Sequence, residues 1–297
     1  MRALASLASL TRPHIVAIAA LGTLVFGWLF TARWAPAPAL IAGLDWFLVN
    51  FVNRAVDARE DRVNRVAGAT WAVRHRTAVV LVAAVVILAS FAVVQAVEPS
   101  LWPLRFAYHL LGLAYNHPLI PVRAGRRVRL KQVYLVKNTA SATGFLLTVF
   151  GYPLIARPIV VSAAYVIVLA VFFFCVELAY EVFYDLRDVA GDRTARVPTF
   201  PVVHGEAAGR AILSGLLATA ALSLCIGYAT SILDFKAFIL GVGPAVQYAA
   251  LRRAMRRGRV TEADCTGLTW VGAGLLLAYA GWVAAGLPLD PIAAWFS

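Results

Sequence analysis

Long apolar stretches alternate with short polar segments along the chain. The apolar stretches reach about 20 residues, the length that a helix needs to cross a bilayer core of roughly 30 Å. Turn-forming residues separate several of them, namely Pro36, Pro38, Pro99, Pro153, Pro158 and Gly205. The pattern predicts nine membrane-spanning helices, at residues 13–32, 36–57, 77–97, 100–117, 131–152, 156–186, 207–230, 234–251 and 264–286.

The sixth stretch is longer than a perpendicular crossing requires, so we expect this helix to tilt or to project beyond the membrane. Composition also indicates a membrane protein. Hydrophobic residues make up 61% of the 297 residues and charged residues only 14%, which excludes an ordinary soluble domain. The three cysteines, Cys175, Cys225 and Cys265, lie in or beside apolar stretches without paired spacing, which indicates neither a disulfide framework nor a zinc site. We therefore expect an all-α polytopic membrane protein.

The net charge of +12 would suggest a nucleic-acid partner in a soluble protein, but the positions of the charges favour membrane topology. Of the 27 lysines and arginines, 23 fall on one side of the predicted membrane. The other side has only Arg33, Arg105, Arg157 and Lys236. The positive-inside rule then predicts a cytoplasmic N-terminus, an inner (cytoplasmic) membrane location, and Ser297 outside. Arg2 and Arg12 precede an apolar run without a clear cleavage site, so no removable signal peptide is expected.

Oxygen side chains recur every four residues at the end of the second predicted span. Asn53, Asp57 and Asp61 share one helix face over two turns. Carboxylate and amide oxygens suit Mg²⁺, and substrate phosphates commonly complete the coordination shell of this ion. The alternative is a solvated helix end in which Arg54 and Arg62 neutralise the acids.

A second row of acids lies at the end of the sixth predicted span. Its members, Glu177, Glu181, Asp185, Asp188 and Asp192, follow one another at steps of four, four, three and four residues, and Tyr184 precedes Asp188 by four. If the two rows face each other across a bundle, they would hold Mg²⁺ ions and a diphosphate between them. The deeper Glu177 and Glu181 are either satisfied core acids or cavity-lining groups that stabilise a cation or take a proton.

Basic residues of the segment "RRVRLKQVYLVKN" (126–138) enter the fifth predicted span. Lys131 and Lys137 are placed to meet phosphate oxygens, and Lys137, one to two turns inside the span, would be costly without an anion. The segment also carries Arg126, Arg127 and Arg129. These arginines either bind phosphate oxygens as well or only hold the loop in the cytosol. Asp45 lies on nearly the same face as Asn53, and it either serves the pocket or is a buried helix-packing acid. His117, at the end of the fourth span, is either a base in the pocket or an interfacial residue.

These motifs resemble the UbiA superfamily of intramembrane prenyltransferases. Asn53, Asp57 and Asp61 match the superfamily's Asn-x3-Asp-x3-Asp motif, and Asp188 and Asp192 match its Asp-x3-Asp motif. A continuation that ends in a Thr-x-Pro turn is also similar, at Thr199 and Pro201. The chain departs from the pattern at Arg54, where many members have Asp. The resemblance implies a single transmembrane domain over 1–297, with helices around a central cavity.

The resemblance also implies roles for individual residues. Catalytic roles fall on Asp57, Asp61, Asp188, Asp192, Lys131 and Glu181. Metal binding falls on Asn53, Asp57, Asp61, Asp185, Asp188 and Asp192. Diphosphate binding falls on Lys131, Lys137, Arg129, Asn53, Tyr115 and Tyr184.

The activity that follows is Mg²⁺-dependent ionisation of an isoprenyl diphosphate and transfer of the prenyl group to an aromatic or other lipophilic acceptor. A terpene cyclase, which uses no acceptor, is the main alternative. A transporter is less favoured, because the motif recurs after four spans as a parallel copy, not an inverted one. The expected partners are the prenyl diphosphate, the acceptor and membrane lipid, not nucleic acid, and the oligomeric state is not predicted. Of eight aromatics near the acids, a few are expected to line the cavity: Trp46, Phe47, Phe51, Phe172, Phe173, Phe174, Tyr180 and Phe183.

Overall fold

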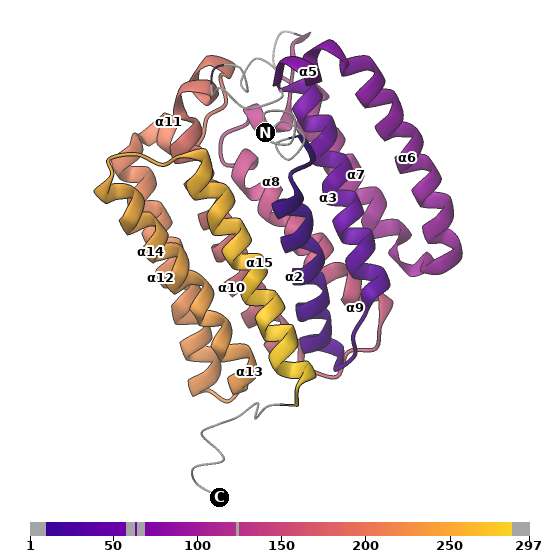
Figure 1. The fold of residues 1–297 in the computed structure, drawn as a ribbon, viewed down its shortest axis with the longest axis vertical. Coiled ribbons are helices and arrows are strands. Elements are labelled where there is room, and N and C mark those ends of the chain that lie inside the picture. The colour runs from indigo at the N-terminus through magenta and orange to yellow at the C-terminus, as the bar shows by residue number, and fades with distance from the viewer. Residues whose placement is uncertain (1–9, 58–62, 64–68, 123–124, 287–297) are drawn as a thin grey trace, which may run out of the picture.

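The long axes of the helices run roughly side by side in a bundle (Figure 1). The computed structural model describes residues 10–57, 63, 69–122 and 125–286. The long helices are α2 (Pro13–Thr31), α3 (Pro36–Val56), α6 (Arg76–Val97), α7 (Trp102–Asn116), α10 (Ala163–Ala195), α12 (Glu206–Ala229), α14 (Val242–Arg256) and α15 (Glu262–Ala284). In a further span, α8 (Val136–Phe145), the π-helical turn η4 (Leu146–Gly151) and α9 (Tyr152–Ala156) continue one another.

Short elements join these helices. They are α5 (Ala69–Arg74), η1 (Pro99–Leu101), η3 (Leu130–Gln132), α11 (Phe200–His204), α13 (Phe235–Phe238) and η5 (Ile239–Gly241). The strands β1 (Ile120–Pro121) and β2 (Arg127–Val128) form a small antiparallel hairpin in which Ile120 pairs with Val128. Local sequence explains several helix starts: proline occupies the first turn of α2, α3 and α7, and the Ser162 hydroxyl accepts a hydrogen bond from the backbone N–H of Tyr165 at the start of α10.

The expectation of an all-α polytopic membrane protein is confirmed. Among the described residues, seven helices are long and apolar enough to span a membrane: α2, α3, α6, the α8–α9 series, α10, α12 and α15. The two other predicted spans correspond to α7, preceded by η1, and to α14, preceded by α13 and η5.

Two predicted boundaries were wrong. The helix predicted at 131–152 begins at Val136, because residues 130–132 form a 3₁₀ turn and Leu135 adopts a positive φ of 67°. The helix predicted at 156–186 begins at Ala163 and continues to Ala195. Pro158 disfavours helical geometry in the residue before it, which delays the start. At about 1.5 Å per residue, α10 is roughly 50 Å long, so it extends past a bilayer core.

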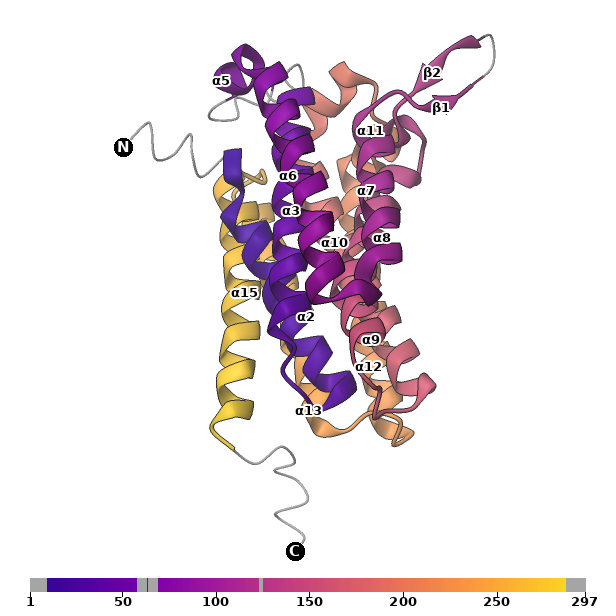
Figure 2. The ribbon, with the colours of Figure 1, turned by 90° about the vertical axis from the view of Figure 1, so that its right-hand side faces the viewer.

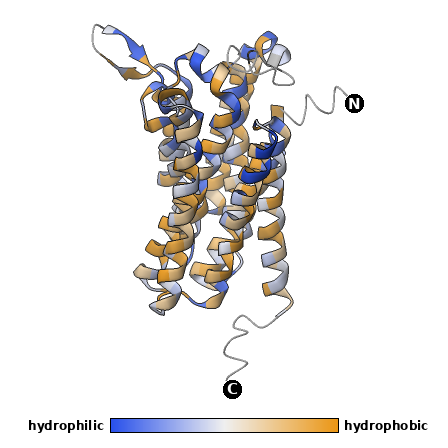
Figure 3. Cartoon of the chain, turned by 90° about the vertical axis from the view of Figure 1, so that its left-hand side faces the viewer, coloured by the Kyte–Doolittle hydropathy of each residue, from blue (hydrophilic) through white to orange (hydrophobic). Residues whose placement is uncertain are grey.

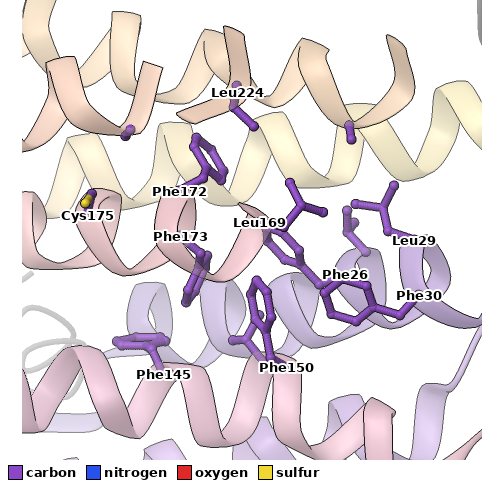
Figure 4. Packing of buried hydrophobic residues seen from close by; sticks show 14 of the residues in the cluster. Phe26, Leu29, Phe30, Phe145, Phe150, Leu169, Phe172, Phe173, Cys175 and Leu224 are labelled. Carbon is purple, nitrogen blue, oxygen red and sulfur yellow. The ribbon is translucent and has the colours of Figure 1, made fainter. Parts of the chain in front are cut away.

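Contacts between neighbouring helices hold the bundle together. α10 packs most extensively on α12, and α2 packs on α3 and α15 (Figure 1). Aromatic rings fill the junction, where Phe26 of α2 lies 4.7 Å from Phe150 of η4 and 5.1 Å from Phe173 of α10 between ring centroids (Figure 4). This core fixes α10 against α2, the two helices that border the site described below.

Polar residues gather at one end of the bundle. α5, α11 and the β1–β2 hairpin all lie at this end, and the hairpin projects beyond the helices (Figure 2). Hydrophilic colours concentrate there, whereas the helical shafts are mainly hydrophobic (Figure 3). We call this end the polar end.

Asp45 and Arg105 form a fully buried ion pair inside the bundle. Arg105, which the sequence analysis counted on the side opposite the basic loops, lies in α7 with 0% side-chain exposure. The guanidinium donates to Asp45 from Nε at 3.0 Å and from Nη2 at 2.5 Å. Tyr152 donates to the same carboxylate at 2.7 Å, and His109 Nε2 lies 3.0 Å away. Asp45 is therefore a packing acid that joins α3, α7 and α9.

Close packing of α12 gives a testable prediction. A Cβ on Gly227 would lie 2.7 Å from Leu233 Cδ1 and 2.9 Å from Val168 Cγ1. We expect Gly227→Ala to lower the free energy of unfolding by about 1–3 kcal/mol, because the core must shift to admit the methyl group. Thermal unfolding in detergent measures this loss.

Gly215 is the matched control on the same helix, since a Cβ there meets nothing within 4 Å. Gly215→Ala should leave stability unchanged or raise it by no more than about 1 kcal/mol. Equal effects of the two variants would contradict the packing argument.

Candidate active site

A cavity of about 190 Å³ lies between α2, α3, α7, α8 and α10. Its walls carry most of the polar and charged side chains that the sequence analysis singled out. These are Asn53, Asp57, Lys131, Lys137, Glu177, Glu181, Asp188 and Asp192. The tyrosines Tyr115 and Tyr184 also line it. We refer to this space as the polar cavity.

The first acid row reaches the polar cavity from the end of α3. The side-chain oxygen of Asn53 is buried and has no hydrogen-bond partner among the described residues. Asp57 caps the helix and accepts hydrogen bonds from Lys131 Nζ at 2.5 Å and from Arg129 Nη1 at 2.9 Å. Asp61, the third member of the predicted row, lies outside the described residues, as do Arg2, Arg59, Arg62, Arg65 and Arg123.

The second acid row reaches the same cavity from α10. Asp188 and Asp192 line it, and Asp188 accepts a hydrogen bond from Arg187 Nε at 2.7 Å. Asp185, predicted as a metal ligand, does not line the cavity: it is buried, bonded to Lys137, and accepts from Asn138 Nδ2 at 2.6 Å. Each step of four residues advances around a helix, so Asp185 falls at the edge of the acid stripe that faces α8.

The two glutamates lie deeper along the same face of α10. Glu181 accepts a hydrogen bond from Ser141 Oγ at 2.8 Å. Glu177 has only 6% of its surface exposed and has no hydrogen bond to any described residue. The interpretation as a core acid whose carboxylate is hydrogen-bonded therefore fits Glu181 better than Glu177.

Of the predicted diphosphate-binding side chains, the two lysines line the cavity from η3 and α8. Lys131, on η3, is 3% exposed, and its Nζ lies 5.9 Å from the ring centroid of Tyr115. Lys137 was placed one to two turns inside a span, but it lies in the first turn of α8, and Asp185 supplies the anion that its burial requires. Arg129 reaches Asp57 but does not line the cavity. Tyr184 lines the cavity and hydrogen-bonds Thr269 at 2.9 Å.

Three further arginines line the polar cavity. From the sequence, Arg12 and Arg187 were assigned to topology, and Arg54 was considered only as a charge that neutralises the acids. Arg12, before the first turn of α2, donates from Nη1 to Asn50 Oδ1 at 2.7 Å. Arg54 and Arg187 each stand next to a motif residue, Asn53 or Asp188. The sequence could have indicated these two arginines, because a residue next to an acid motif in the chain lies close to the cavity that the motif lines.

Apolar residues form the deep wall of the polar cavity. Trp46 stacks on Phe145 with ring centroids 3.8 Å apart and donates from Nε1 to Thr148 Oγ1 at 3.0 Å. Beyond this wall lies a second cavity of about 300 Å³, which we call the apolar cavity. Of the eight aromatics considered from sequence, four line one or both spaces: Trp46, Phe172, Phe173 and Tyr180.

The donor set fits Mg²⁺ bound together with a substrate. In the described ranges, no three carboxylate, histidine or cysteine side chains lie close enough to hold a metal ion by themselves. Mg²⁺, however, usually takes one or two carboxylates and completes its shell with waters and phosphate oxygens. Asn53 offers a buried oxygen that no described residue hydrogen-bonds, and Asp57, Asp188 and Asp192 supply carboxylates on the two sides of one cavity. This arrangement suits an ion shared between protein and diphosphate.

Comparisons with known proteins agree with this geometry. The sequence profile of the UbiA prenyltransferase family matches residues 13–271. A UbiA homologue from Archaeoglobus fulgidus bound to DMAPP and Mg²⁺ superimposes with a TM-score of 0.69 at 16% identity, over 94% of this chain and 99% of that one.

Two other solved structures are similar. The Archaeoglobus fulgidus homologue bound to GPP and Mg²⁺ gives a TM-score of 0.68 at 15% identity, over 94% and 99% of the two chains. An apo UbiA homologue from Aeropyrum pernix K1 gives 0.62 at 15% identity, over 91% and 97%. No curated protein matches the chain closely enough to count as a relative. The fold is shared with these structures, the family profile covers most of the chain, and the protein therefore belongs to the UbiA prenyltransferase family of integral membrane proteins.

Proposed function

We propose that the protein is a Mg²⁺-dependent intramembrane prenyltransferase that binds an isoprenyl diphosphate in the polar cavity and transfers the prenyl group to a lipophilic acceptor. The observation that carries the proposal is the placement of acids from α3 and α10, together with Lys131 and Lys137, around one cavity. Homologues of the same fold bind DMAPP or GPP with Mg²⁺, which supports the same donor class here.

Charge neutralisation is the main task of this site. Asn53, Asp57, Asp188 and Asp192 would hold Mg²⁺, which withdraws charge from the diphosphate and makes it a better leaving group. Lys131 and the nearby arginines donate hydrogen bonds to the phosphate oxygens, and these bonds strengthen as negative charge develops on the departing diphosphate. Lys131 and Arg129 both pair with Asp57, and this contact holds Lys131 at the cavity wall.

The rest of the cavity protects the reactive carbon. The buried apolar wall excludes water, and the faces of Trp46 and Tyr180 stabilise a developing allylic cation. The same lining would serve a terpene cyclase, which uses no acceptor. Mass spectrometry of products formed with and without a panel of acceptors separates the two activities.

We further propose that the polar end lies at the cytoplasmic side of the inner membrane, with the N-terminus cytoplasmic and the active site opening on that side. The basic residues of the hairpin and of the α14–α15 connection support this orientation. The whole chain then acts as one catalytic domain. Proteolysis of inside-out and right-side-out vesicles at the α14–α15 connection tests the orientation: cleavage of right-side-out vesicles alone would contradict it.

Lys131 gives a direct test of diphosphate binding. We expect Lys131→Ala to raise the KM for the prenyl diphosphate by about 10- to 100-fold, because a buried cation that binds phosphate is lost. Steady-state kinetics in detergent measures the change. Arg252→Ala, which removes an exposed charge from α14 outside the cavity, is the matched control and should behave as wild type. An unchanged KM in Lys131→Ala would move the role to Lys137 or the loop arginines.

A further inference from the structure

Lys131 lies in a segment that is too short to hold its own position. η3 is a single 3₁₀ turn between the hairpin and α8. The backbone N–H of Gln132 donates to the carbonyl oxygen of Arg129 at 2.9 Å, and the Gln132 Oε1 accepts from the Arg129 N–H at 3.0 Å. A turn of this length has few hydrogen bonds of its own. The position of the Lys131 side chain therefore depends on contacts between this segment and the rest of the fold.

One group of contacts lies on the cavity side of η3. Lys131 Nζ and Arg129 Nη1 donate to Asp57 at 2.5 Å and 2.9 Å. In the proposed function Asp57 binds Mg²⁺ and Lys131 binds the diphosphate, so the bond between Lys131 and Asp57 has to weaken when the substrate enters. This contact cannot by itself place Lys131 for the diphosphate, and other contacts must hold the segment at that stage.

A second group of contacts, which we call the outer contacts, joins the same segment to the ends of α10 and α11. The hydroxyl of Tyr134 hydrogen-bonds Nε2 of His204 at 2.5 Å, and the Tyr134 ring packs edge-on against Phe200 with centroids 6.2 Å apart. Gln132 Nε2 donates to the carbonyl oxygen of Ala195, the last residue of α10, at 3.4 Å. None of these residues lines the polar cavity, so the outer contacts remain available when the cavity is filled.

The backbone next to Tyr134 is strained, which also indicates that the segment is fixed from outside. Leu135 has φ 67° and ψ −32°, a conformation that is uncommon for residues with a Cβ. Such a conformation persists only where surrounding contacts determine it. The Leu135 side chain is 47% exposed, so these contacts fall on its neighbours, Tyr134 on one side and the start of α8 on the other.

We propose that the hydrogen bond between Tyr134 and His204 positions Lys131 for the diphosphate. The proposal rests on the proposed prenyltransferase function and adds two positioning residues to it. Neither residue lines the cavity, and both act through Lys131. The outer contacts tie the segment that carries Lys131 to the end of α10 that carries Asp192, so they fix the distance between a phosphate-binding cation and an acid on the other side of the cavity.

A purely stabilising surface contact is the alternative interpretation. Tyr134 is 38% exposed, and a hydrogen bond at such a site contributes little to the free energy of unfolding. A stabilising contact would change the KM for the prenyl diphosphate by the same factor in any variant of the protein. A positioning contact changes this KM only while Lys131 is present, because its effect passes through that side chain.

The kinetic experiment uses the full chain in detergent with Mg²⁺. The donor is the one of dimethylallyl, geranyl, farnesyl and geranylgeranyl diphosphate from which the wild type releases most diphosphate. Tyr134→Phe keeps the ring and removes the hydroxyl, and it should raise the KM for this donor about 3- to 10-fold with little change in kcat. His204→Ala should have the same effect. His204→Gln offers an amide near the position of Nε2 and should restore the KM to within about twofold of the wild type.

A double-variant comparison then tests whether the effect passes through Lys131. In the Lys131→Ala background, Tyr134→Phe should change the KM by less than about twofold. Tyr134→Phe and His204→Ala combined should be no worse than either alone, since both remove one hydrogen bond. Tyr248→Phe is the matched control, because it removes the hydroxyl of an exposed tyrosine on α14 outside the cavity, and it should behave as wild type.

Hydrogen exchange provides a measurement that does not depend on turnover. In the protein without substrate, the backbone amides of residues 129–136 should exchange about 3- to 10-fold faster in Tyr134→Phe and His204→Ala than in the wild type, because the segment opens more often. Tyr248→Phe should leave their exchange unchanged.

Several results would overturn the inference. They are a wild-type KM in Tyr134→Phe and His204→Ala, an equal KM increase from Tyr134→Phe with and without Lys131, additive effects of the two variants, and unchanged exchange at residues 129–136. Each of these leaves diphosphate release by the wild type intact. Absence of diphosphate release from all four donors in the wild type would instead overturn the proposed function itself.

Discussion

Replacement of Asp188 by alanine is expected to lower kcat for diphosphate release by at least about 10³-fold while the protein stays folded. Asp188 lines the polar cavity on α10, opposite Asn53 and Asp57 on α3. Without this carboxylate the α10 side loses a ligand for Mg²⁺, and the neighbouring Arg187, which now bonds Asp188, is left to attract the phosphate without an ion between them. Kinetics of diphosphate release, with circular dichroism and gel filtration as folding checks, measure the effect.

Glu206→Ala provides the matched control, because it removes a carboxylate from the exposed start of α12, outside the cavity. Its activity should equal that of the wild type. Asp57→Ala, on the opposite wall, should repeat the loss seen with Asp188→Ala. Full activity in either cavity variant would refute the assignment of these acids to the metal.

Replacement of Asp45 by leucine is expected to destabilise the protein by about 3–5 kcal/mol, because Arg105 would remain as a buried charge without its partner. Arg105 and Asp45 both have 0% side-chain exposure. The change also removes the acceptor for the Tyr152 hydroxyl, so α3, α7 and α9 lose a shared contact. Thermal unfolding in detergent, measured by intrinsic fluorescence, reports the loss.

The double variant Asp45→Leu/Arg105→Met separates the cost of an unpaired charge from the cost of lost packing. Replacing both members of a buried ion pair by apolar residues is often close to neutral. We therefore expect the double variant to recover most of the stability that Asp45→Leu loses. A double variant as unstable as the single one would show that the packing, and not the unpaired arginine, determines the effect.

Much of the helical framework could be predicted from the chain itself. Apolar length and the positions of prolines located the seven described helices that are long enough to span a membrane, as well as α7 and α14. They did so because a bilayer imposes a minimum length and lets only internally bonded backbone cross it. The boundaries at Val136 and Ala163 could not be read in this way. They depend on a 3₁₀ turn and on Pro158, which interrupt the helix without changing the hydropathy.

Spacing along a helix located the acid rows but not the partner of each acid. One face of α10 lines the polar cavity with Glu181, Asp188 and Asp192, as the spacing predicts. Asp185 lies at the edge of that face and pairs with Lys137 on α8. That pairing depends on how α8 packs against α10, which the spacing within α10 does not contain. The metal and diphosphate roles assigned to these residues stay predictions.

Residues that act through tertiary contacts were the hardest to predict. The pairing of Arg105 with Asp45 was not predicted, because a sequence cannot show that a residue sixty positions earlier lies beside it. Tyr134 and His204 were given no role from the sequence, and only the packing of the loop before α8 against α11 brings them together. In both cases the contact joins residues that are far apart in the chain, which is a property of the fold.

The most direct test of the account is diphosphate release by the purified protein in detergent, measured with dimethylallyl, geranyl, farnesyl and geranylgeranyl diphosphates in the presence of Mg²⁺ or of a chelator. The account predicts release from at least one donor that requires Mg²⁺ and disappears in Asp188→Ala. No release from any of these donors, or release that persists with the chelator, would contradict the claim that acids of α3 and α10 share Mg²⁺ with a prenyl diphosphate.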